Sequence, residues 1–71
     1  MDKKKEYRIE MYSLYAKLRD DRSFNDAQVA EKTGIGRSTF SDWKIGRSAP
    51  KIEKLMKIAD LFKVSLAEFV P

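Results

Sequence analysis

Apolar residues in the first third of the chain recur at the spacing of an α-helix. Their intervals are four, three, one and three residues, which gathers them on one face. The pattern predicts a helix from about residue 6 to residue 21, with Tyr12 off the main stripe at the edge of the core. The predicted core stripe consists of Tyr7, Met11, Leu14, Tyr15 and Leu18.

Two short helices joined by a tight turn are predicted next. Asn25 is a favourable N-cap for a helix that begins at Asp26. Gly34 stands just past the end of that helix, where glycine enters the left-handed region at little cost. A second helix is predicted from about residue 37 to residue 44, and Gly46 ends it in the same way. Two short helices around a glycine-containing turn form a helix-turn-helix pattern.

The helix predicted at residues 37–44 has two different faces. Phe40 and Trp43 are three residues apart and share one side, which Ile35 joins from the preceding turn. This position favours the core over a stacking platform for single-stranded nucleic acid. The opposite face has no large apolar residue, and a face of this kind suits the major groove of DNA. Its polar side chains are Arg37, Ser38, Ser41 and Asp42.

The helical pattern continues to the end of the chain. Pro50 and Lys51 open a helix, and the Ser65–Glu68 pair has the spacing of a capping box for a last short helix. The apolar positions of these two helices are Ile52, Leu55, Met56, Ile58, Ala59 and Phe62, then Leu66, Phe69 and Val70. We therefore predict an all-α fold, a compact bundle of about five short helices that contains a helix-turn-helix.

Length and composition narrow the possible chemistry. The 71 residues allow one small domain, residues 1–71. The sequence has no Cys and no His, the residues most often used as thiolate nucleophile, general base or metal ligand. It also lacks a phosphate-cradling glycine loop and metal-ligand spacings. We expect no catalytic residue, no cofactor and no metal, and therefore no enzyme.

Positive charge is concentrated around the second helix of the pattern. The net charge is +4, and residues 36–57 account for all of it with six cations and two carboxylates. This excess favours a polyanionic partner. The charged residues 1–5 are expected to form a frayed basic arm, which is either solvated or in contact with phosphate. With no apolar run near the ~20 residues that span a bilayer, we expect a cytoplasmic protein and no membrane partner.

The run VAEKTGIGRSTFS at residues 29–41 resembles the phage-repressor, or XRE-type, helix-turn-helix family. The resemblance continues through WKIGR at 43–47, Pro50, KLMKIA at 54–59 and KVSL at 63–66, and covers roughly residues 8–70. Several short motifs match at fixed spacing, which is more specific than a lone glycine spacing. The resemblance implies a lambda-repressor-like DNA-binding domain.

The polar face and the resemblance together predict the contacts with DNA. Base contacts are expected from Arg37, Ser38, Ser41 and Asp42. Arg37 either bridges O6 and N7 of a guanine or grips only phosphate. Asp42 either accepts from cytosine N4 or pairs with Arg37 or Lys44. Phosphate contacts are expected from Gln28, Thr39, Lys44, Arg47 and Lys51.

Four positions depart from the family pattern. Asp26 stands where the family often has a phosphate-binding Gln, and a carboxylate there repels phosphate unless it is turned away or paired. Gln28, two positions later, either makes a phosphate contact in place of residue 26 or makes none. Gly36 stands where the family commonly has Ser or Thr as the N-cap of the second helix. Ile45 stands where many members have Asn. Ser23 replaces a common Gly, so the first helix is expected to end in a different shape.

The sequence thus predicts a transcriptional regulator that binds double-stranded DNA with the helix at about 37–44 in the major groove. It would be encoded by a bacterium or phage and associated with the nucleoid when bound. A homodimer is expected at least on DNA, with half-sites ~34 Å apart. Residues 65–71 either form the dimer contact or cover the core of the monomer. The alternative is an antitoxin-type or other protein-interaction helix-turn-helix module.

Overall fold

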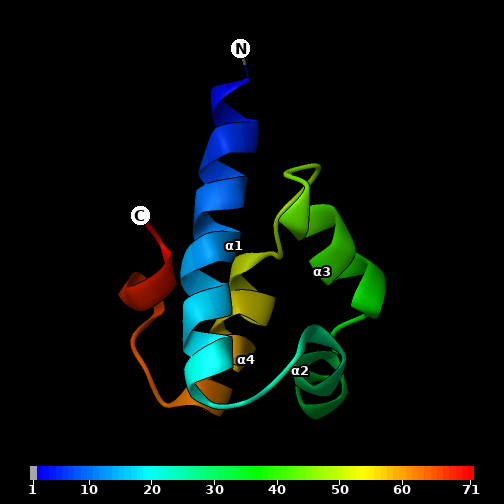
Figure 1. Cartoon of the computed structure of the whole chain (residues 1–71), viewed down its shortest axis with the longest axis vertical. Helices are drawn as coiled ribbons and strands as arrows, with labels where there is room; N and C mark the ends of the chain where they lie inside the picture. The colour runs from blue at the N-terminus through cyan, green and yellow to red at the C-terminus, as the bar shows by residue number, and fades with distance from the viewer. Residues whose placement is uncertain (1) are drawn as a thin grey trace.

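The computed structural model describes residues 2–71, and within them five helices follow one another along the chain. They are α1 (Lys3–Asp21), α2 (Asp26–Thr33), α3 (Arg37–Lys44), α4 (Ile52–Phe62) and the 3₁₀ helix η1 (Leu66–Phe69). The long α1 has α2 and α3 on one side and η1 on the other (Figure 1). The predicted all-α fold is confirmed. None of the helices in the described range has both the length and the apolar character that a membrane span requires.

α1 begins three residues earlier than the apolar pattern predicted. The carboxylate of Asp2 accepts hydrogen bonds from the backbone N–H groups of Lys4 (3.0 Å) and Lys5 (3.3 Å) and caps the helix. A negative charge at this end also stabilises the helix dipole. Residues 3–5 therefore form a helical turn, which corrects the expected frayed arm, and Met1 lies outside the described residues.

The core is built around a stack of aromatic rings between α1, α3 and α4. The ring centroid of the buried Tyr15 lies 4.9 Å from that of Trp43, 5.6 Å from Phe40 and 6.0 Å from Phe62. Such pairs each contribute about 0.5–1.5 kcal/mol beyond the burial of their area. The buried aliphatic residues around the stack are Met11, Val29, Ala30, Ile35, Leu55, Ile58 and Ala59.

The predicted apolar stripes are wrong at three positions and incomplete at a fourth. Tyr7, Ile52 and Met56 were expected in the core, but their exposed fractions are 42%, 55% and 54%. Tyr7 belongs to the first turns of α1, which extend beyond the other helices (Figure 1). Ile52 and Met56 are four residues apart and share the outer side of α4. Tyr12 was expected at the edge of the core and is instead buried, with its ring against the edge of Trp43.

The ends of the helices follow the predicted turns in part. Ser23 has a φ of +58°, so α1 does end in an unusual conformation, and Gly34 ends α2 with a φ of +76°. The capping box predicted at the last helix is not formed. The Ser65 hydroxyl accepts instead from the N–H of Ala67, and the four residues that follow Ser65 form a 3₁₀ turn that contacts α1 and α4 and buries Phe69.

Candidate nucleic-acid interface

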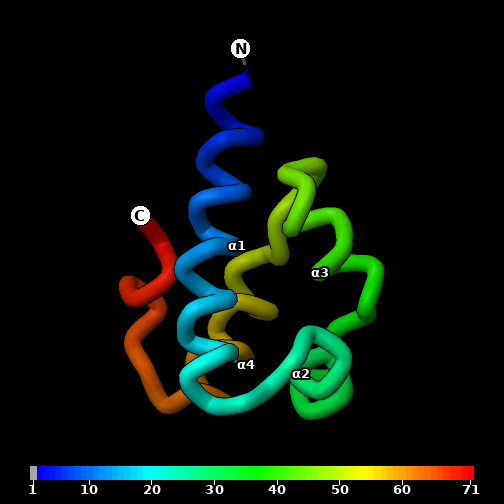
Figure 2. The backbone as a smooth tube through the Cα atoms, viewed as in Figure 1, coloured from blue at the N-terminus to red at the C-terminus, as the bar shows by residue number. Residues whose placement is uncertain are grey.

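α2 and α3 form the predicted helix-turn-helix. Asn25 caps α2 by accepting from the N–H of Gln28 (2.8 Å), and the Gln28 amide oxygen accepts from the N–H of Asn25 (2.9 Å). The chain then turns sharply at Gly34 before α3 begins (Figure 2). Gly36 is the N-cap of α3 and contributes no side-chain hydrogen bond to it.

α3 buries one face and exposes the other, as predicted. Phe40 and Trp43 are almost completely buried, together with Ile35 from the turn. Arg37, Ser38 and Ser41 are exposed, whereas Thr39 and Asp42 are partly covered. Because the aromatic pair fixes the rotation of the helix, the three exposed side chains are held on the outside, where a DNA groove could receive them.

Asp42 has a partner that the sequence did not suggest. Its carboxylate lies 3.4 Å from the guanidinium of Arg47, rather than against Arg37 or Lys44. The carbonyl of Asp42 also accepts from the backbone N–H groups of Arg47 (2.9 Å) and Ser48 (3.4 Å). The Arg47 side chain is 71% exposed, and an exposed pair of this kind contributes only about 0–1 kcal/mol. A phosphate could therefore replace Asp42 as the partner of Arg47 at little cost.

The segment between α3 and α4, residues 45–51, packs against the beginning of α1. One nitrogen of Arg8, Nη1, donates to the carbonyls of Gly46 (3.2 Å) and Arg47 (3.3 Å). A Cβ on Gly46 would lie 2.7 Å from Cγ of Lys5, so only glycine allows this close approach. Sequence reasoning missed the packing of Lys5 and Arg8 against this segment, because their neighbours are about forty residues away in the chain.

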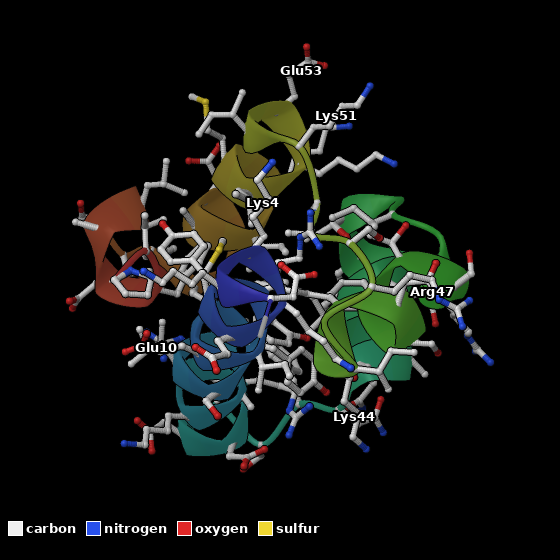
Figure 3. The ribbon with its side chains drawn as sticks, turned by 90° about the horizontal axis from the view of Figure 1, so that it is seen from above. Lys4, Glu10, Lys44, Arg47, Lys51 and Glu53 are labelled. Atoms are coloured by element: carbon white, nitrogen blue, oxygen red, sulfur yellow. The ribbon has the colours of Figure 1, made fainter. Side chains whose placement is uncertain are left out.

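The cationic residues predicted to contact phosphate remain available along this segment. Lys44, Arg47 and Lys51 are exposed, and Figure 3 shows them spread around the end of the molecule at which α1 begins. Ile45 is half exposed and offers no hydrogen-bonding side chain. The segment thus offers charged side chains, a usual means of holding a DNA backbone, whereas the N–H groups of Gly46, Arg47 and Ser48 already donate to carbonyls of α3.

The amino end of α2, on the other side of α3, has a different chemistry. The Asp26 carboxylate accepts from the phenols of Tyr12 and Tyr15 and from Nη1 of Arg19 (2.8 Å). Burial alone would raise the pKa of Asp26, but the hydrogen bonds from Tyr12, Arg19 and Tyr15 outweigh it and lower this pKa. Burial and the bond to Asp26 raise the pKa of Tyr15. Asp26 is therefore a paired carboxylate, one of the two arrangements the sequence left open.

Gln28 lies at the same end of α2. Its side chain is exposed, but its amide oxygen is occupied by the capping bond to Asn25. The amide nitrogen is the group that remains for a phosphate, because a side-chain amide has two donor hydrogens there. Gln28 therefore keeps both donor hydrogens of its amide for DNA.

Comparison with known proteins finds a family match that includes α2 and α3. The pattern of the helix-turn-helix family matches residues 16–69. The chain is 36% identical over 53 residues to the cryptic phage CTXphi transcriptional repressor RstR of Vibrio cholerae. That alignment covers 75% of this chain and 48% of the relative, so the chain spans about half the length of that protein. No solved structure matches the chain significantly.

Proposed function

The chain belongs to the helix-turn-helix family, and on this premise we propose that it binds double-stranded DNA sequence-specifically and regulates transcription as a phage-type repressor does. The observation that carries the proposal is the orientation of α3. Its aromatic side is buried and its polar side is exposed, next to a cationic segment. The similarity to a named phage transcriptional repressor supports the same function.

Each residue of the interface has a proposed role. Arg37, Ser38 and Ser41 contact base edges in the major groove, and the fork of Arg37 suits O6 and N7 of guanine. Asp42 holds Arg47 in the free protein and becomes available for a cytosine when Arg47 moves to phosphate. The remaining phosphate contacts come from Gln28, Thr39, Lys44 and Lys51.

The protein acts on DNA as a homodimer in this proposal. Residues 65–71 were one candidate for the interface, but Phe69 is directed into the core, which supports their role as a lid. Ile52 and Met56 form an exposed apolar strip on α4, and burying it would be favourable. We place the dimer contact on this strip. A strip of this kind would also suit the partner of a protein-interaction module, which is the alternative function.

Selection of bound sequences from a pool of random duplexes tests the proposal directly. A specific regulator enriches one sequence, and a dimer enriches two related half-sites about one helical turn apart. Titration of the selected duplex should then show affinity that falls steeply with salt, since lysine and arginine displace counterions. A folded protein that enriches no sequence and ignores every duplex at low ionic strength would exclude DNA binding.

A further inference from the structure

The two sides of α3 differ in the cations that they offer to a phosphate. Resting on the DNA binding proposed above, we propose that the first two turns of α1 bind the DNA backbone beyond the segment 45–51. The DNA backbone is then held mainly on the side of α3 where α1 begins, and the amino end of α2 contributes little. The ligand is the phosphate backbone of the duplex that flanks the base-contacting helix.

The amino end of α2 is poorly suited to phosphate. Arg19 is the cation at this corner, and it is already shared between Asp20 (2.9 Å) and Asp26 (2.8 Å). The two phenols that point to Asp26 donate their protons to it and are not free for another acceptor. A phosphate that approaches here meets more carboxylates than cations, which is unfavourable at short range.

The beginning of α1 has the opposite character. Residues 2–8 contain four cations and two carboxylates, and one of the carboxylates, Asp2, is used as the cap of the helix. Lys3, Lys4 and Lys5 are exposed. Because the cap keeps these lysines on a helix, they are presented at fixed positions and lose less freedom on binding than a disordered arm would.

The lysines of α1 and the cations of segment 45–51 belong to one surface. Lys5 touches Gly46, and Arg8 holds the carbonyls of Gly46 and Arg47. Seen from above in Figure 3, Lys4 lies on the side of α1 toward Lys51, whereas Glu10 lies on the opposite side of α1. A backbone bound at Arg47 or Lys51 can therefore continue along the beginning of α1.

The length of the helix sets the reach of this surface. Four residues separate Arg8 from Lys4, which is about 6 Å along a helix that rises 1.5 Å per residue. A DNA strand carries one phosphate per ~3.4 Å of axis, so this distance corresponds to on the order of two phosphates. The lysines should thus extend the contact by about two phosphates on the flank of the site.

The salt dependence of binding tests the inference with matched charge changes. The variant Lys4→Gln/Lys5→Gln is compared with Lys17→Gln/Lys57→Gln, whose exposed lysines lie elsewhere on α1 and on α4. Lysine and glutamine have similar helix propensities, so both pairs should keep the fold, which circular dichroism checks. The slope of the logarithm of the association constant against log salt should become shallower by roughly 1.8 per bound protomer for the first pair, since each lost contact removes about 0.9. The control pair should keep the slope of the wild type.

One further variant and one shorter duplex complete the experiment. Lys4→Arg/Lys5→Arg should retain the slope of the wild type, because it keeps both charges. Shortening the duplex to the selected sequence alone should abolish the difference between the wild type and Lys4→Gln/Lys5→Gln, because the flanking phosphates are then missing. If the wild type binds its site and the two Gln pairs behave alike, the inference fails while the proposed function stands. If the wild type binds no duplex, both fail together.

Discussion

Arg19 in the last turn of α1 and Asp26 at the first residue of α2 form an ion pair of 2.8 Å. Two phenols from the same face of α1 complete the cluster, because Tyr12 and Tyr15 both donate to the Asp26 carboxylate. Asp26 is the position at which the family often has a phosphate-binding glutamine. In this chain the residue links α2 to α1 through its hydrogen bonds to Tyr12, Tyr15 and Arg19.

The first prediction concerns the stability that the cluster around Asp26 provides. Asp26→Ala should lower the free energy of unfolding by about 1–3 kcal/mol, because it leaves the phenols and the guanidinium without their shared acceptor. Urea denaturation measures the change. Glu31→Ala, at an exposed site of the same helix, is the control and should stay within about 0.5 kcal/mol of the wild type. Equal losses in the two variants would show that the cluster adds nothing to stability.

The second prediction concerns alkaline pH. Burial, together with the hydrogen bond to Asp26, raises the pKa of Tyr15 above its ordinary value of 10.0. In the unfolded chain this phenol loses its proton at a lower pH than in the fold. Its contribution to stability is therefore fully present below pH 10.0 and declines as the pH rises further. Urea denaturation in a pH series that crosses 10.0 should show this decline, and stability independent of pH there would contradict it.

The third prediction separates base contacts from phosphate contacts. Arg37→Ala should weaken binding to the selected site by about 1–3 kcal/mol and relax the preference at one base pair, with the fold unchanged. The matched variant Arg47→Ala should weaken binding to all sequences alike and make the salt slope shallower by about 1 per bound protomer. Parallel titrations of the selected and a scrambled duplex measure both. A loss for Arg47→Ala that is confined to one base pair would reverse the two assignments.

The fourth prediction tests the exposed strip on α4. Met56→Lys should reduce self-association, because it places a charge in the apolar contact that we propose, and it should leave the monomer folded since the side chain is exposed. Analytical ultracentrifugation across a range of concentrations measures the dimer. Lys57→Gln, at the next position of the helix, is the control. A dimer that persists unchanged in Met56→Lys would move the interface elsewhere, residues 65–71 included.

The parts of the fold that were predicted from sequence depend on local signals. The bounds of α2 and α3 follow from Asn25, Gly34 and the spacing of Phe40 and Trp43, all within about twenty residues. The beginning of α1 was missed, because Asp2 in a charged run looks like part of a disordered arm until its carboxylate is seen on the N–H groups of Lys4 and Lys5.

The predictions that failed depend on which helix surfaces pack against one another. A stripe of apolar residues on α4 cannot show that Leu55 is covered while Met56 is not, since that depends on where the other helices pack. The pairing of Asp26 likewise requires α1 to pass the amino end of α2 with Arg19 toward it. The contact of Arg8 with segment 45–51 spans 38 residues of sequence, and no spacing rule relates them.

The last prediction compares two glycines with nearly the same backbone. Gly34 and Gly46 have φ values of +76° and +78°, so replacement by alanine costs roughly 1–2 kcal/mol of conformational strain at either site. At Gly34 a Cβ would meet nothing within 4 Å, whereas at Gly46 it would lie 2.9 Å from the backbone carbonyl oxygen of Lys5.

The backbone of α1 cannot move aside as a flexible side chain could, so Gly46→Ala should cost about 1–3 kcal/mol more than Gly34→Ala. Urea denaturation of the two variants gives the difference directly, and each serves as the other's control for the strain they share. Equal losses would mean that segment 45–51 does not rest on α1. In that case the continuous surface of Lys5, Arg8 and Arg47, on which the extended backbone contact depends, would not exist.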